Sequence, residues 1–173
     1  FADISDRKQA EEALRRSEER YRTLFESLDE GFCVIEMLFD EHEKPIDYRF
    51  LEVNPAFERQ TGLVEATGKT AREIIPGLED YWCEIYGKVA LTGEPVRFEQ
   101  GSEAMNRWFE VSAFRTPEPH SRKVALLFKE ITDRKQAENL LLQHYSKLRL
   151  FVKHSPVGVA MFDRQMQYML VSD

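Results

Sequence analysis

The sequence has few of the features that place a chain in a membrane, on a nucleic acid or in an oxidising compartment. Its longest apolar strand core is VALLF at 124–128, whereas a membrane-spanning helix needs about 20 apolar residues. The net charge is -7 and no basic stripe is present, so we expect neither nucleic-acid binding nor direct membrane contact. The two cysteines, Cys33 and Cys83, lack metal or disulfide spacing. Together with the missing secretory signal, this predicts a cytoplasmic protein.

What the sequence does contain is typical of a globular domain. Hydrophobic residues make up 42% and charged residues 32% of the 173 positions, a balance that supports a core and argues against disorder. The chain starts with Phe1 instead of Met and ends at Asp173 without a stop signal for a helix or strand. We therefore interpret it as a piece of a longer protein.

An internal repeat marks both ends of the chain. ISDRKQAE at 4–11 and ITDRKQAE at 131–138 agree at seven of eight positions and lie 127 residues apart. The same register brings Gly31 onto Gly158. A period of this length corresponds to a whole domain with its connector, since solenoid repeats are much shorter.

Each copy of the repeat is predicted to open a helix. Asp6 with Gln9, and Asp133 with Gln136, have the spacing of a capping box. The residues that follow form a heptad seam, in alternating steps of four and three. The first seam is Ala10, Leu14, Ser17, Tyr21, Leu24 and Leu28, and the second is Ala137, Leu141, His144, Leu148, Phe151 and Ser155. Such a helix either pairs with its copy in a homodimer or folds onto its own domain, and the pattern leaves both open.

Between the two helices, alternating and mostly apolar segments predict five strands. They are 31–39, 46–53, 96–100, 107–115 and 123–131. Asn54 is expected to cap a short helix that begins at Pro55 and ends at Gly62. Residues 68–77 are expected to be irregular or a single helical turn, and 78–93 a longer helix. This order predicts an α+β fold, an antiparallel sheet with the helices on one face.

Two motifs resemble those of the PAS family. NPAFERQTG at 54–62 is similar to the asparagine-led motif that follows the second PAS strand, and EITDRKQAE at 130–138 to the motif that closes the last strand and opens the signalling helix. The residues that carry the first motif are Asn54, Pro55, Phe57, Thr61 and Gly62. The resemblance implies a five-stranded PAS sheet flanked by coiled-coil-like signalling helices. It also implies a tandem-PAS bacterial signalling protein, with a sensor histidine kinase as the expected parent and a diguanylate cyclase as the alternative.

On this interpretation the chain has five segments. They are the end of a preceding PAS domain (1–5), a helical linker (6–28), the PAS domain (29–132), a second helical linker (133–154) and the first strands of a truncated following PAS domain (155–173). Because the strands of the last segment lack the rest of their sheet, we expect them to be disordered or to pair with a neighbouring chain.

The resemblance also raises the question of a cofactor. The candidate pocket residues are Phe57, Trp82, Tyr86, Phe98 and Trp108, although aromatic residues at such spacings also form plain core. Haem is not expected, because no histidine lies between 43 and 119 and only the Cys83 thiolate could serve as a ligand there. Light-sensing flavin PAS domains carry an Asn-Cys-Arg motif soon after the Thr-Gly pair, and no cysteine follows Gly62 before Cys83. A non-covalent flavin or small organic ligand stays open, and no metal site is predicted.

No group of residues predicts catalysis within this chain. GLVEATGKT at 62–70 has five residues between its glycines, whereas a phosphate-binding loop needs four. The resemblance instead implies a sensory and dimerisation module linked to neighbouring PAS and kinase or other output domains. Its relay residues would be Glu130, Ile131, Thr132, Asp133 and Arg134, which pass a shift of the last strand to the following helix. The alternative is an assembly or spacer module without a ligand.

Overall fold

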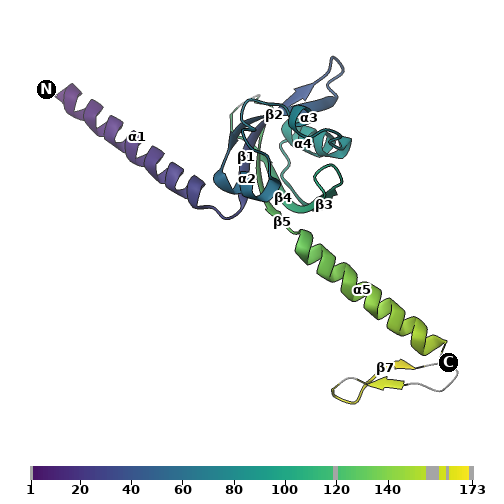
Figure 1. Ribbon diagram of the computed structural model, residues 1–173. Helices are drawn as coiled ribbons and strands as arrows, with labels where there is room; N and C mark the ends of the chain where they lie inside the picture. Colours follow the sequence, from purple (N-terminus) through teal and green to yellow (C-terminus); the bar gives the residue numbers. More distant parts are fainter. Residues whose placement is uncertain (1, 119–120, 155–159, 163, 172–173) are drawn as a thin grey trace. The chain divides into compact units, whose positions relative to one another are not determined.

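The computed structural model describes residues 2–118, 121–154, 160–162 and 164–171 (Figure 1). The chain forms two compact units that divide between Ile131 and Thr132. The first unit holds the predicted domain and the helix before it. Its elements are α1 (Ala2–Ser27), β1 (Gly31–Phe39), β2 (Pro45–Val53), α2 (Pro55–Thr61), α3 (Ala71–Ile74), α4 (Asp80–Thr92), β3 (Val96–Ser102), β4 (Arg107–Arg115) and β5 (Lys123–Glu130).

The five strands form one antiparallel sheet in the order β2-β1-β5-β4-β3. Strands β1 and β4 alternate between buried and half-buried or exposed residues, as the period of two along a strand requires. The buried phase of β5 includes Val124, Leu126 and Phe128, and it packs with α2, α3 and α4 into one hydrophobic core. The predicted α+β architecture is confirmed, with β5 in the middle of the sheet.

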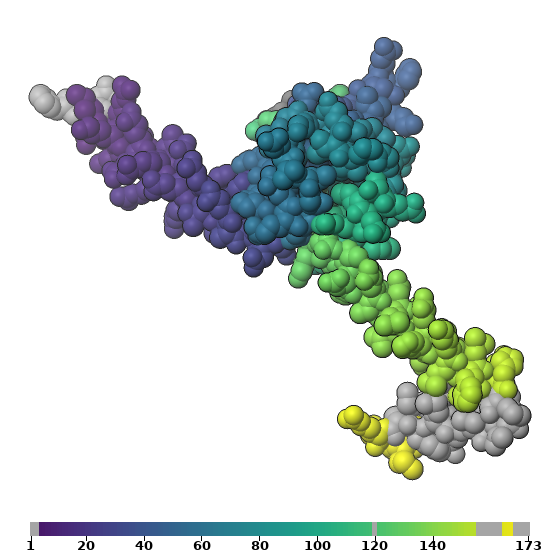
Figure 2. All heavy atoms as spheres, viewed as in Figure 1, coloured from purple at the N-terminus to yellow at the C-terminus, as the bar shows by residue number. Residues whose placement is uncertain are grey.

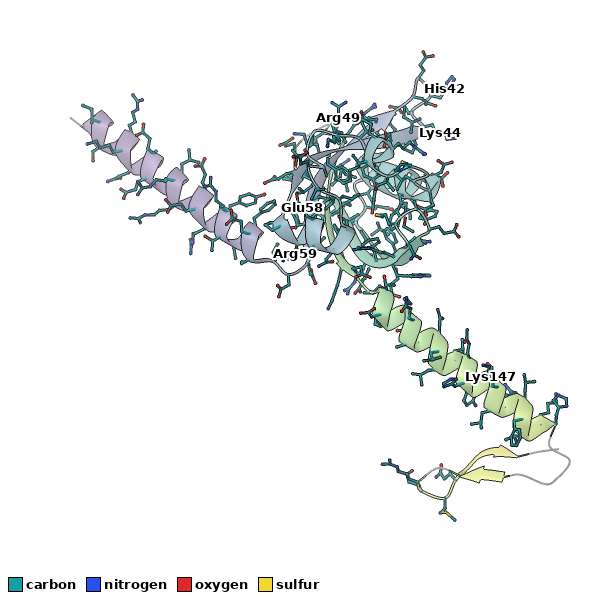
Figure 3. The ribbon with its side chains drawn as sticks, in the orientation of Figure 1. His42, Lys44, Arg49, Glu58, Arg59 and Lys147 are labelled. Carbon is teal, nitrogen blue, oxygen red and sulfur yellow. The ribbon has the colours of Figure 1, made fainter. Side chains whose placement is uncertain are left out.

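Local signals fix the ends of the helices that cover the sheet. The Asn54 side chain accepts a hydrogen bond from the Phe57 N–H at the start of α2, and Pro55 occupies the first helical position. Gly62 ends α2 with a φ of 77°, a left-handed conformation that glycine adopts without strain. Between β1 and β2, the Asp40 carboxylate accepts hydrogen bonds from the His42 and Lys44 amides. This turn protrudes from the domain (Figures 2 and 3).

Helix α1 begins earlier than the sequence predicts. It starts at Ala2, so Asp6 lies inside the helix and does not cap it, and residues 2–5, assigned above to the end of a preceding domain, are helical. Extending an existing helix by one turn costs little once it is nucleated, so a single capping pattern need not stop it. The last two turns of α1 dock on the domain, because Phe25 packs edge-to-face on Phe32 and the Tyr21 hydroxyl donates to Glu52 over 2.9 Å.

The second unit contains α5 (Thr132–Lys153) and a hairpin of β6 (Ala160–Phe162) and β7 (Tyr168–Val171). Helix α5 begins one residue before the predicted cap, which leaves Asp133 in its first turn, where a carboxylate interacts favourably with the helix dipole. Strands β6 and β7 pair with each other, so the described part of this segment is not disordered, whereas pairing of its outer edges with a neighbouring chain stays a prediction. Residues 155–159, 163 and 172–173 of that predicted segment lie outside the described residues.

Candidate functional site: a small aromatic pocket beside the last strand

The domain core encloses a pocket of about 50 Å³ between the sheet and the helices α2 and α4. It is lined mostly by aromatic and aliphatic side chains, from the sheet and from the helices. They are Cys33, Tyr48, Phe50, Phe57, Thr61, Leu63, Ile75, Trp82, Tyr86, Met105, Phe109, Val111, Leu126 and Phe128. Strand β5 therefore contributes two side chains to the pocket wall.

The structure places three of the five predicted pocket residues in this wall, namely Phe57, Trp82 and Tyr86. Phe98 lies behind it, with ring centroids 6.0 Å from Trp82 and 6.5 Å from Tyr86. Trp108 is 39% exposed and does not line the pocket, because its phase of β4 faces away from the core.

Several lining residues were missed at the sequence level, including Phe109 beside Trp108. The alternation along 107–115 could have identified Phe109, because it shares a phase with the buried Val111 and Ala113. Phe109 and Phe128 pack edge-to-face with centroids 5.7 Å apart. The pocket is thus closed on the sheet side by rings from neighbouring strands.

The residues present do not fit haem or flavin in the pocket at this size. Pockets for organic ligands usually enclose about 300–1,000 Å³, and the 14 lining residues include no histidine and no charged side chain. Burial raises the pKa of the Cys33 thiol and of the Tyr48 and Tyr86 phenols, so all three are neutral. Cys83 is buried outside the lining, and burial also raises the pKa of its thiol. Both thiols are therefore neutral in this structure.

The turn between β3 and β4, which carries the lining residue Met105, is fastened to the start of α4 by Glu79. Its carboxylate accepts hydrogen bonds from the Ser102 hydroxyl and the Ala104 N–H, both over 3.0 Å, and from the Trp82 indole over 3.1 Å. Burial opposes ionisation of Glu79, but these hydrogen bonds outweigh it and lower the pKa. The contribution of this carboxylate to stability is therefore present at neutral pH and is lost as the pH falls through the lowered pKa.

The predicted relay residues lie on both sides of the boundary between the units. Within the first unit, the Glu130 N–H donates to the Gln60 side chain over 2.8 Å and the Ile131 N–H to the Trp108 carbonyl over 2.8 Å. Thr132, Asp133 and Arg134 form the first turn of α5 in the second unit. Along the chain, Ile131 alone separates β5 from α5.

The glycine-rich stretch at 62–70 does not form a phosphate-binding loop. Its backbone amides are used within the domain, with the Gly68 N–H donating to the Phe50 carbonyl and the Lys69 N–H to the Ala66 carbonyl. The Thr70 N–H donates to the Glu73 carboxylate. Among the described residues, no group of three or more histidine, cysteine or acidic side chains could hold a metal ion. In the same part of the chain, no helix is long and apolar enough to cross a membrane.

Comparisons with known proteins agree with this architecture. A family model described as PAS domain matches residues 19–95. The PAS domain of an HTR-like protein from Haloarcula marismortui is similar in structure, with a TM-score of 0.53 and 19% identity over 72% of this chain and 99% of that chain. An RNA-binding light-oxygen-voltage receptor has a TM-score of 0.52 and 16% identity, over 79% of this chain and 39% of the receptor. No curated protein matches the sequence.

The sheet order and the covering helices define the class: an α+β domain with a PAS-like fold. Residues 19–95 match the PAS family, as the motif at 54–62 predicted, and the motif at 130–138 lies outside the matched residues.

Proposed function

We propose that this PAS domain is a cytoplasmic sensory and dimerisation module of a bacterial two-component sensor histidine kinase, in which β5 passes a signal to α5 and the output domain. The observation that carries the proposal is the position of β5. Its side chains Leu126 and Phe128 line the pocket, and only Ile131 lies between its end and α5. A change in the pocket would thus act on the strand whose next element is the helix toward the output.

The proposed relay makes the first turn of α5 a control point. Replacing Asp133 with alanine in the full-length protein is expected to change the response to signal roughly two- to fivefold, because a carboxylate at a helix start is worth about 0.3–1 kcal/mol. The domain should stay folded, with a stability change no larger than about 1 kcal/mol. The measurement is output activity with and without signal, alongside urea denaturation. Lys147→Ala, an exposed change farther along α5 (Figure 3), is the control, and equal responses in wild type and Asp133→Ala would contradict the relay.

We further propose that the flanking helices form a parallel homodimer. On α1 the seam residues Leu14, Tyr21 and Leu24 are 61%, 51% and 66% exposed in the single chain. On α5, Leu141 and Phe151 are 71% and 67% exposed, whereas the last seam position, 155, lies outside the described residues. Apolar side chains repeated at heptad spacing and left exposed are typical of a helix that pairs with its copy.

Replacing Leu24 with aspartate is expected to weaken this dimer by roughly a hundredfold or more, because each chain then places a charge in the apolar seam. Thr23→Asp adds the same charge one residue off the seam and should leave the dimer intact. Native mass spectrometry across a concentration series gives both stoichiometries. The same spectra would reveal a small molecule that the protein retains. Loss of the dimer in both variants or in neither would count against the seam.

A second candidate function is an assembly module that spaces its neighbours without a ligand. The small pocket favours this function, because a volume of about 50 Å³ holds no more than a few water molecules. The two functions share the dimer and differ in whether a change inside the core reaches β5. The sensory function then requires a very small ligand, an expansion of the pocket or a partner bound to the domain surface.

A further inference from the structure

The start of the short helix α2 forms hydrogen bonds with the segment between α1 and β1, where the chain enters the domain. The Asn54 side chain, 1% exposed, accepts from the Phe32 N–H over 2.9 Å. Its amide group donates to the carbonyls of Phe25 over 3.3 Å and Glu30 over 3.0 Å. The start of α2 is therefore fixed to the last turn of α1 and to the start of β1.

Near the other end of α2, the Gln60 side chain contacts both the α1–β1 segment, where the chain enters the domain, and the end of β5, where it leaves. The Gln60 amide nitrogen donates to the Asp29 carbonyl over 2.6 Å, and its amide oxygen accepts from the Glu130 N–H over 2.8 Å. The guanidinium of Arg107 also donates to the Gln60 backbone carbonyl, which ties this end of α2 to β4.

The two hydrogen bonds of the Gln60 side chain lie just beyond the end of the pairing between β1 and β5. The β1–β5 pairing runs as far as Gly31 opposite Phe128. Two residues before Gly31 and two residues after Phe128, the same register would place Asp29 opposite Glu130, beyond the last β1–β5 pair. The Gln60 amide lies between these two backbone groups and offers one donor and one acceptor, as a peptide group of an inserted strand would.

We propose that Gln60 is a coupling residue that makes the α1–β1 junction and the end of β5 move together. The pairing between β1 and β5 ends at Gly31 and Phe128, so the side-chain bridge extends the connection between these two strands to the point of entry and the point of exit. An amide is required, because leucine offers neither hydrogen bond and glutamate offers only the acceptor. The coupling deepens the proposed relay, but it is a property of the domain and can be tested without any output.

The test is amide hydrogen exchange of the 173-residue chain, followed residue by residue by NMR. In Gln60→Leu, the Glu130 N–H is expected to exchange about tenfold faster than in wild type, because it loses its acceptor. In Gln60→Glu the acceptor remains, so the Glu130 N–H should stay within about twofold of wild type. Arg59→Ala, an exposed change at the neighbouring position of α2 (Figure 3), should leave the exchange unchanged.

The coupling itself is measured by loosening α1 with Phe25→Ala, which removes the ring packed on Phe32. With Gln60 present, this change should accelerate exchange of the distant Glu130 N–H about fivefold. In the Gln60→Glu background, where the bond to Asp29 is missing, the acceleration should fall below about twofold. An unchanged Glu130 rate in Gln60→Leu, or an equal effect of Phe25→Ala in both backgrounds, would overturn the proposal. An Asp133→Ala variant that responds to signal as wild type does would refute the relay to the output and leave this result standing.

Discussion

Replacing Phe128 with alanine is expected to lower the free energy of unfolding by about 3–5 kcal/mol, measured by urea denaturation. The ring is 7% exposed and packs edge-to-face on Phe57 and Phe109, with centroids 5.8 and 5.7 Å apart. It also covers the backbone at Gly31, where an added Cβ would approach the ring to 2.3 Å. No neighbouring side chain can fill the space without breaking one of these contacts, so a cavity should remain.

The matched control is the next residue toward the start of the same strand. Leu127 belongs to the opposite phase of β5 and is half-buried, so Leu127→Ala should cost clearly less, about 1 kcal/mol. The Phe128→Ala cavity should also bind benzene, as apolar cavities made by large-to-small substitution do. Equal losses for the two variants would mean that β5 does not present Phe128 to the core as described.

Replacing Asn54 with alanine is expected to cost about 3 kcal/mol, because a helix cap is lost and buried groups lose their partners. The Asn54 side chain accepts hydrogen bonds from the N–H groups of Phe32 and Phe57. It donates hydrogen bonds to the carbonyls of Phe25 and Glu30. Asn54→Asp keeps the oxygen that accepts from both N–H groups and turns an oxygen toward the two carbonyls, so part of the loss should remain.

The control for this prediction is Asn139→Ala on the exposed surface of α5, expected within about 0.5 kcal/mol of wild type in the same urea denaturation. Asn54→Ala losing no more than this control would show that the asparagine-led motif is not structural. An Asn54→Asp variant as stable as wild type would show that the two carbonyl contacts contribute little.

The strands and helix ends could be predicted because their causes are local. Alternation along 107–115 and 123–131 reports which phase faces a core, and Asn54, Pro55 and Gly62 act on residues within a few positions. The five-stranded antiparallel sheet followed from the order of these elements. The helix start at Ala2 was missed, because a capping pattern at Asp6 marks a place where a helix can begin and does not require it to.

The site was only partly predictable, because its decisive contacts join residues far apart in the sequence. Gln60 reaches Glu130 across 70 positions, and Glu79 reaches Ser102 across 23. A single glutamine or glutamate in a polar stretch carries no sign of such a partner. Trp108 was expected at the pocket because it is aromatic, yet the alternation that placed Phe109 inside also placed Trp108 outside. The phase of the strand was the better guide than the type of the side chain.

The central claim is that a change inside the pocket reaches the helix after β5. It is tested most directly by hydrogen exchange of the Phe128→Ala protein with and without benzene in the enlarged pocket. The account predicts that benzene slows exchange along β5, at the Gln60-bonded Glu130 N–H and in the first turn of α5, by about tenfold. Slower exchange confined to α4 and the pocket wall, with residues 130–136 unaffected, would contradict it.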